Sequence, residues 1–378
     1  MGLPGINITF KEQGVTAITR SQRGIVALIL KDTVPGTNPV TITTPNEIPK
    51  DLNDFNKEQI NLALIGYQTP PKKIIAYVLP EDAEDYTEAQ NYFETVRWDY
   101  VAVPAIAEGE VMSFAAWVKG LRDTKNKKVK AVLPNCAADH EGIINFTTEA
   151  IATGIATTYD SGAGYDEGET YAKEYSTAEY CSRIAGMIAG TPLTISCTFA
   201  PLPEVIDCNK MTTEELDEAI DKGELVLYND GEKIKIARGV NSLVTTTEGK
   251  LDSFKKIKIV EAMDLMYDDI KKTAEDNYLG KYSNSYDNKC LLISAILGYL
   301  EGLEIDGILN RGFSEVGIDM ESQTAFLKSI GYKTNDGRTV DEMNELEIKN
   351  ADTKDKVFLY AKVKILDAIE EITLNVSL

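Results

Sequence analysis

The feature that most constrains the fold is an alternation of short apolar runs with amphipathic segments between residues 23 and 200. Several of the runs are apolar at nearly every position, which is typical of strands in a parallel sheet that helices cover on both faces. The intervening segments have helical spacing, so the pattern predicts a doubly wound α/β domain. The predicted strands are 24–30, 73–79, 100–105, 129–134, 142–147 and 193–198, and the predicted helices are 54–66, 84–97, 110–123 and 176–190.

A change of pattern after residue 200 predicts a hairpin that completes the α/β domain at residue 240. Asn229-Asp230-Gly231 is a strong turn signal between two short strands, so we expect a hairpin over 225–238, preceded by a helix over 213–222. Residues 154–168 are expected to form a long exposed loop. The step Arg238-Gly239 ends the hairpin and is interpreted as a domain junction, because glycine accepts unusual backbone dihedrals; an ordinary strand end remains the alternative.

The rest of the chain is expected to form a C-terminal domain, helical or α+β, over 241–350, flanked by terminal arms at 1–22 and 351–378. Both arms alternate apolar with other residues, which is strand periodicity. The apolar positions are Ile6, Ile8 and Phe10 in the first arm, then Val357, Leu359, Ala361, Val363 and Ile365, and finally Ile372, Leu374, Val376 and Leu378.

Charge and segment composition exclude several partners. The chain carries 39 basic and 60 acidic residues, a net charge of -21, which argues against nucleic-acid binding. The basic run Lys125–Lys130 is interpreted as a solvated turn, and the acidic clusters, Asp268-Asp269 among them, as solvated helix ends.

No run approaches the ~20 apolar residues of a membrane helix, and the N-terminus lacks the pattern of a signal peptide. Five cysteines without paired spacing fit reduced, mostly buried thiols.

Catalytic chemistry finds little support in the sequence. His140 is the only histidine, and Cys136 is its nearest candidate nucleophile, although a loop histidine beside a strand-end cysteine is the simpler interpretation. There is no G-x-S-x-G elbow, no set of zinc ligands, and no EF-hand spacing in the acidic clusters. We therefore predict no catalytic residue, no cofactor and no metal, and expect His140→Ala to leave assembly intact.

Four segments, in order, resemble the contractile-tail sheath family of bacteriophages and phage-tail-like bacteriocins. GLPGINITFKEQGVTAITRSQRGIVALILKD (Gly2–Asp32) resembles the family's N-terminal arm with its first strand, and KIKIARGVNSL (Lys233–Leu243) resembles the step between its domains. IVEAMDLMYDDIKKTAEDNYLGKYSNS (Ile259–Ser285) resembles a helix followed by a Gly-Lys-Tyr-x-Asn loop, and VFLYAKVKILDAIEEITLNVSL (Val357–Leu378) resembles the family's C-terminal arm. The chain departs from larger sheath proteins in lacking their inserted surface domains.

The resemblance implies a structural subunit of hexameric rings stacked around a tail tube, with neighbouring subunits linked by strand exchange. It implies a subtilisin-like α/β domain without protease activity. It also implies tail tube, baseplate and tail terminator proteins as partners, and assembly in the host bacterial cytoplasm into a virion tail or bacteriocin particle. On this basis the terminal strands are expected to act in trans, with flexible connections at 14–23 and 350–356. A basic patch of Lys328, Lys333 and Arg338, near a helix capped by Asp319, is the expected tube contact.

Two other classes stay open at this point. An α/β hydrolase-like or subtilisin-like enzyme would need His140 close to a nucleophile. A non-contractile surface or adhesion protein would use the acidic loops for binding.

Overall fold

A computed structural model describes residues 18, 23–156 and 170–376. Within this part of the chain, the contacts define two compact units, one formed by 23–265 with 367–376 and the other by 266–366. The sequence places the domain boundary at 240/241 instead. The structure differs because the segment 241–265 is packed against the α/β sheet, by contacts described below.

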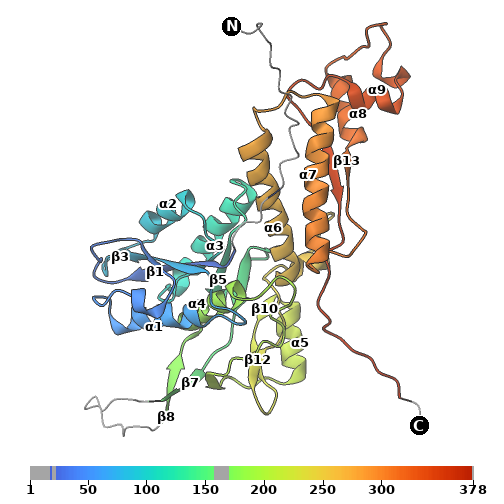
Figure 1. Ribbon diagram of the computed structural model, residues 1–378. Coiled ribbons are helices and arrows are strands. Elements are labelled where there is room, and N and C mark those ends of the chain that lie inside the picture. The colour runs from blue at the N-terminus through green and yellow to red at the C-terminus, as the bar shows by residue number, and fades with distance from the viewer. Residues whose placement is uncertain (1–17, 19–22, 157–169, 377–378) are drawn as a thin grey trace, which may run out of the picture. The chain divides into compact units, whose positions relative to one another are not determined.

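A seven-stranded sheet forms the centre of the first unit, in the order β10-β6-β5-β4-β1-β3-β2 (Figure 1). All neighbouring pairs are parallel except β2 with β3, which is antiparallel at the sheet edge. The strands are β1 (Ile25–Lys31), β2 (Val40–Ile42), β3 (Lys73–Leu79), β4 (Tyr100–Ala102), β5 (Lys130–Pro134), β6 (Ile143–Phe146) and β10 (Glu224–Leu225).

Helices cover both faces of this sheet, so alternate residues of each strand enter two separate cores. Val26, Leu28 and Leu30 of β1 lie in one core with α1 (Asp54–Ile65) and α4 (Thr177–Ala189). Ile25, Ala27 and Ile29 lie in the other core with α2 (Thr87–Thr95) and α3 (Glu108–Asp123). Burial on both faces is why these strands read as continuous apolar runs. The predicted doubly wound α/β domain is therefore confirmed, as are its four helices.

Two sequence expectations for this unit are wrong. Residues 193–198 form turns instead of a strand, and only Cys197 among them is buried. Part of the segment expected to be a loop is a strand: β7 (Ile151–Ala156) pairs antiparallel with β8 (Thr170–Tyr175) and with β9 (Val205–Asp207). Alternation alone misleads at 193–198, because Pro192 begins a turn in which Ile195 N–H donates to its carbonyl.

The hairpin predicted after residue 200 is confirmed. Leu227–Asn229 (β11) pairs antiparallel with Ile234–Ile236 (β12), after the short helix α5 (Thr213–Asp221). Gly231 supplies a φ of 97° at the turn, and Asn229 Oδ1 accepts its N–H at 2.8 Å. The turn residues thus act as their composition predicts.

The second unit combines helices with a two-stranded sheet. Helix α6 (Ile257–Thr273) contributes residues to both units; α7 (Tyr286–Ile305), α8 (Met320–Ser329) and α9 (Glu345–Asn350) belong to the second. Its sheet pairs β13 (Glu315–Ile318) antiparallel with β14 (Leu359–Lys362). The expected α+β character of the C-terminal domain is therefore observed. No helix in the described ranges is long and apolar enough to span a bilayer.

The connection expected to be flexible at 350–356 is anchored. Asn284, from the Gly-Lys-Tyr-x-Asn loop, donates through Nδ2 to Thr353 Oγ1 (3.0 Å), Lys354 O (2.8 Å) and Lys356 O (2.9 Å). Thr353 is fully buried and also accepts a hydrogen bond from Lys289 Nζ at 3.1 Å. These contacts hold the chain that leads into β14, so this segment is not a free hinge within its unit.

Candidate functional site

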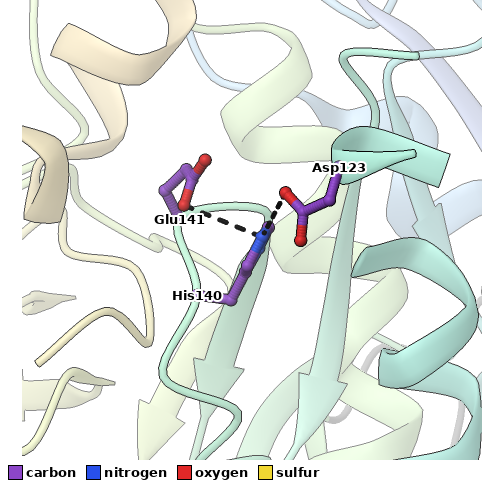
Figure 2. Close-up of side chains that lie close together, drawn as sticks. All are labelled: Asp123, His140 and Glu141. Atoms are coloured by element: carbon purple, nitrogen blue, oxygen red, sulfur yellow. Dashed lines mark hydrogen bonds and ion pairs between the residues drawn. The ribbon is translucent and has the colours of Figure 1, made fainter. Parts of the chain in front are cut away.

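The single histidine lies in a buried turn between β5 and β6 (Figure 2). His140 Nε2 is 3.3 Å from Asp123 Oδ1, at the end of α3, and 3.8 Å from Glu141 Oε2. Within 23–156 and 170–376, these three side chains are the group of histidine, cysteine and acidic residues close enough together to hold a metal ion. The site therefore has to be tested as a metal centre.

Hydrogen bonding at the imidazole argues against a metal. Nδ1 accepts the Gly142 N–H at 2.9 Å, so the proton of the neutral ring lies on Nε2 and faces Asp123. A metal on Nε2 would require the proton on Nδ1, opposite another N–H donor, whereas metal-bound histidines normally donate to an acceptor there. Glu141 is already engaged by Lys250, with contacts of 3.1 Å. The residues present do not fit a metal.

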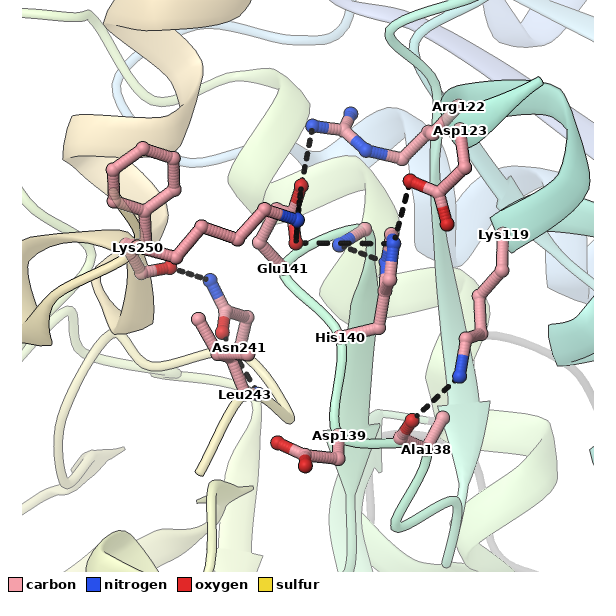
Figure 3. A network of polar contacts seen from close by, with 12 residues as sticks. Lys119, Arg122, Asp123, Ala138, Asp139, His140, Glu141, Asn241, Leu243 and Lys250 are labelled. Atoms are coloured by element: carbon pink, nitrogen blue, oxygen red, sulfur yellow. Dashed lines mark hydrogen bonds and ion pairs between the residues drawn. The ribbon is translucent and has the colours of Figure 1, made fainter. Parts of the chain in front are cut away.

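The turn around His140 has a structural role (Figure 3). Asp139 Oδ1 accepts the backbone N–H groups of residues 244 and 245, at 2.7 and 2.9 Å. Ser242 Oγ accepts the His140 N–H at 3.2 Å and donates to the His140 carbonyl at 3.0 Å. The turn thereby fastens residues 241–250 to the α/β sheet. The pKa of His140 is lowered, mainly by burial. The imidazole is therefore neutral in the folded chain.

The cysteine candidate is not brought into the histidine site. Cys136 Sγ contacts Met112 Sδ at 3.9 Å, and its thiol is not part of the group formed by Asp123, His140 and Glu141. Burial raises the pKa of Cys136 to about 11, so the thiol is protonated at neutral pH and is a poor nucleophile. The described geometry gives no Cys-His pair.

A buried cluster of charges is the largest feature that the sequence analysis missed. Lys130 Nζ lies 2.6 Å from Glu261 Oε1 and 2.7 Å from Asp264 Oδ2, and Arg122 makes two 3.0 Å hydrogen bonds to Asp264. Tyr100 OH donates to Glu261 at 2.5 Å. Although burial raises the pKa of both carboxyl groups, the neighbouring cations lower it more, to about 2 for Glu261. The cluster holds the first half of α6 against the sheet.

Two interpretations of charged runs as solvated surface are therefore wrong in part. Lys130 is fully buried although it ends the basic run 125–130, and Asp269 is fully buried and accepts the Tyr299 hydroxyl at 2.8 Å. The partners are distant in sequence, so no local pattern reveals them. The placement of Glu261 and Asp264 three residues apart on the apolar face of α6 is the one signal that points to a buried pair.

The predicted junction residues Arg238 and Gly239 lie at a close contact with the C-terminal segment. Arg238 donates to Glu370 Oε2 from Nε (3.1 Å) and Nη2 (3.0 Å). Gly239 is not among the residues with positive φ, so it is not needed for an unusual dihedral. A Cβ there would lie 2.8 Å from Cys197 Sγ, so glycine is required for close approach.

The two C-terminal strands differ in the described chain. Leu359 and Ala361 belong to β14, which pairs with β13 of the same chain, and Ile365 forms a bridge with Leu309. Val357 and Val363 flank this strand. In contrast, the expected strand over 372–378 is not formed within its described part, where Ile372, Leu374 and Val376 are 84%, 79% and 71% exposed. Ile6, Ile8 and Phe10 lie outside the described residues.

The expected basic patch in the second unit is a mixed cluster of charges. Lys328 forms an ion pair with Asp341, and Arg338 contacts Glu347 at 2.6 Å and Asp336 at 2.8 Å. Asp319 caps α8 through the Ser322 N–H, as expected. With two of its three cations paired within the unit, the patch lacks the excess positive charge that the sequence suggested for Lys328, Lys333 and Arg338.

Comparison with known proteins identifies the class. Residues 81–242 match the family model described as the phage tail sheath protein central domain, and residues 250–378 match the phage tail sheath C-terminal domain. The chain is 37% identical over 384 residues to the tail sheath protein of Clostridium phage phiCD119, covering all of this chain and 99% of the relative. The chain therefore belongs to the phage tail sheath family, and it is a structural component of a phage-type tail.

Solved structures show the same fold. A sheath tail protein from Desulfitobacterium hafniense aligns with a TM-score of 0.67 and 18% identity, over 83% of this chain and 94% of that chain. The helical sheath of the anti-feeding prophage in its contracted state aligns with a TM-score of 0.69 and 14% identity, over 100% and 99% of the two chains. The expected combination of an α/β domain with a separate C-terminal domain is thus shared with sheath proteins.

Proposed function

We propose that this protein is the repeating subunit of a contractile sheath. In this proposal it assembles as stacked hexameric rings around a tail tube, in contact with baseplate and terminator proteins, and contracts to drive the tube through a bacterial envelope. Membership of the tail sheath family supports the assembly, and the fold shared with a contracted helical sheath supports the contraction. We propose no catalytic activity, because the described residues around His140 serve to fasten the chain.

The observation that carries the proposal is the incomplete pairing of strands near the C-terminus. The sheet β13–β14 has only two strands among the described residues and is poorly buried, and a lone pair of strands is marginally stable in water. The segment 372–376 has alternating exposed apolar residues and no strand partner among the residues that the structure describes. Open strand edges and unpaired apolar strands complete one another when chains associate.

We infer that neighbouring copies supply the missing strands. The segment 372–376, and the N-terminal segment around Ile6–Phe10, would add to sheet edges of other subunits, while β14 remains paired with β13 and presents its second edge. Exchange at both termini would keep the array connected while weaker surface contacts, worth about 0–1 kcal/mol each, are broken and remade during contraction.

Deletion of residues 1–20 tests the exchange at the N-terminus. We expect a folded monomer with near-native circular dichroism that forms no cylinders in negative-stain electron microscopy, since one of the two linking strands is lost. The full-length chain in the same buffer is the control. Normal cylinders from the deletion variant would refute this role of the N-terminal segment.

The tube contact remains a separate proposal. Lys328, Lys333 and Arg338 are retained as candidates, although the ion pairs of Lys328 and Arg338 with nearby acids weaken the charge argument. In a co-assembly with the tube protein, Lys328→Glu with Lys333→Glu should reduce the fraction of cylinders that contain a tube. An unchanged fraction would show that the contact lies elsewhere.

A further inference from the structure

One carboxylate in the mostly exposed C-terminal segment is largely covered by side chains of the α/β unit. The Glu370 side chain is 9% exposed, while its neighbours Ile369 and Glu371 are each 86% exposed. A buried charge requires partners, because its desolvation is costly. Glu370 is therefore the most covered side chain through which the segment 367–376 contacts its own α/β unit, beside the more exposed Asp367 and Glu371.

The pocket supplies donors to both carboxylate oxygens. Thr198 Oγ1 donates to Oε1 at 2.8 Å, and Arg238 donates to Oε2 from two nitrogens. Lys256 Nζ lies 3.4 Å from Oε2 and also pairs with Asp367 at 2.5 Å. Burial raises the pKa of Glu370, but these donors and cations lower it more, so the carboxylate is ionised at neutral pH.

The glycine beside Arg238 makes room for this arrangement. The Gly239 N–H donates to Thr198 Oγ1 at 3.0 Å, which orients the hydroxyl toward Glu370. A Cβ at Gly239 would lie 3.1 Å from Ser196 Oγ and 2.8 Å from Cys197 Sγ. The step Arg238-Gly239 therefore serves as one wall of a carboxylate pocket: arginine binds the charge and glycine permits the hydroxyl groups to approach.

We propose that Glu370 is a positioning residue that fixes the base of the C-terminal arm to its own α/β unit and presents residues 371–376 to a second copy of this chain. In a strand, residues 370, 372, 374 and 376 share one face. The α/β unit of the same chain covers only Glu370. The three exposed apolar side chains that follow on this face fit an apolar strand acceptor on another copy. This proposal rests on the proposed function for its partner.

Fixing the base of the arm lowers the entropy that assembly must remove. A tethered strand that already leaves its subunit at a defined point loses less conformational freedom on pairing than a free tail does. Replacing Glu370 by glutamine keeps the size of the side chain and removes the charge that Arg238 and Lys256 bind. We expect the ratio of docked to free arm to fall about tenfold, the usual effect of losing a hydrogen bond to a charged group.

A spin label at position 369 measures docking directly in the unassembled chain. Ile369 is exposed, so Ile369→Cys provides an accessible thiol for the label. Cys290→Ser removes the half-buried native thiol, and the four remaining native cysteines are buried. We expect restricted motion of the nitroxide in this parent, and fast motion after Glu370→Gln. Glu371→Gln is the matched control, since Glu371 is exposed and lies 3.7 Å from Arg238. Equal mobility in the parent and Glu370→Gln would overturn the proposal.

Assembly provides the second measurement. Glu370→Gln should raise the protein concentration required for cylinders several-fold, Glu371→Gln should leave it near that of the parent, and Arg238→Gln combined with Glu370→Gln should be no worse than the more severe single variant. Additive effects, or a lower required concentration for Glu370→Gln, would refute the positioning role. If the parent forms no cylinders, the proposed function fails, while the spin label still decides whether Glu370 holds the arm.

Discussion

Strand β1 and the C-terminal segment 367–376 contain similar apolar residues and have opposite surroundings. Every apolar residue of β1 is buried, and its backbone pairs with β3 on one side and β4 on the other. Ile372, Leu374 and Val376 are exposed and no strand of the described chain pairs with them. The first region is complete within one chain, whereas the second has no strand partner in the described chain and, in our proposal, is covered by another copy. The proposal thereby assigns stability and assembly to different parts of the molecule.

The largest effect on the self-contained region should come from Asp264→Ala. This change leaves Arg122 and Lys130 buried with one fewer acid, and breaking a buried ion pair costs about 3–5 kcal/mol. The free energy of unfolding from urea denaturation measures the loss. Asp252→Ala is the control, because its exposed pair with Lys255 should contribute about 0–1 kcal/mol. Similar losses in both variants would contradict the account of the buried cluster.

The packing of β1 itself is tested by Leu28→Ala. Leu28 is fully buried in the core shared with α1 and α4, so we expect a loss of about 2–5 kcal/mol in the free energy of unfolding. The size of the loss reflects both the transfer of the side chain and the cavity that remains. A loss below about 1 kcal/mol in urea denaturation would show that the sheet is less tightly covered than described.

A smaller effect is expected at the single histidine. His140→Ala leaves the Gly142 N–H without its acceptor, at a cost of about 1–3 kcal/mol, and the chain should still fold and assemble. Because burial lowers the pKa of His140 below its ordinary value of 6.5, the unfolded chain binds the proton more readily. The contribution of His140 is thus complete above pH 6.5 and is lost as the pH falls through the lowered pKa.

Urea denaturation at several pH values checks this sign. Between pH 7.5 and 5, the parent should lose more free energy of unfolding than His140→Ala does, since the variant has no histidine left to protonate. Identical pH dependence in the two proteins would contradict the neutral, hydrogen-bonded imidazole.

The smallest effect on the isolated chain should follow a change in the exposed segment. Ile372→Ser should alter the free energy of unfolding of the monomer by less than about 0.5 kcal/mol, because the side chain is exposed and covers no core. The same change should weaken assembly, since it removes an apolar residue from the proposed exchanged strand. A destabilised monomer would mean that the segment packs on its own subunit.

The contrast between these regions also explains what the sequence reveals. The α/β order, its helices and the hairpin at 225–238 depend on local periodicity and turn residues, which a single chain displays. The buried cluster of Lys130, Glu261 and Asp264 depends on partners more than one hundred residues apart, and charged side chains taken alone indicate solvent. The same limitation hides the pocket for Glu370, where Thr198 and Arg238 meet the tail only in the folded chain.

The strand pattern near the C-terminus shows a different limitation. Alternation predicts strands over 357–365 and 372–378, and the structure forms part of the first within the chain. Periodicity states that a segment is suited to a sheet, but it does not state which chain provides the neighbouring strand. In our proposal, residues 372–376 become a strand only in the assembly.

Removal of the exposed segment tests the central claim most directly. A chain truncated after Glu370 keeps the contact with Arg238 and loses residues 371–378. Purified at equal concentration with the full-length chain, it should show the same urea midpoint and circular dichroism, yet form no cylinders in negative-stain electron microscopy. Cylinders of normal length and yield from the truncated chain would contradict the account, because the C-terminal segment would then be dispensable for linking subunits.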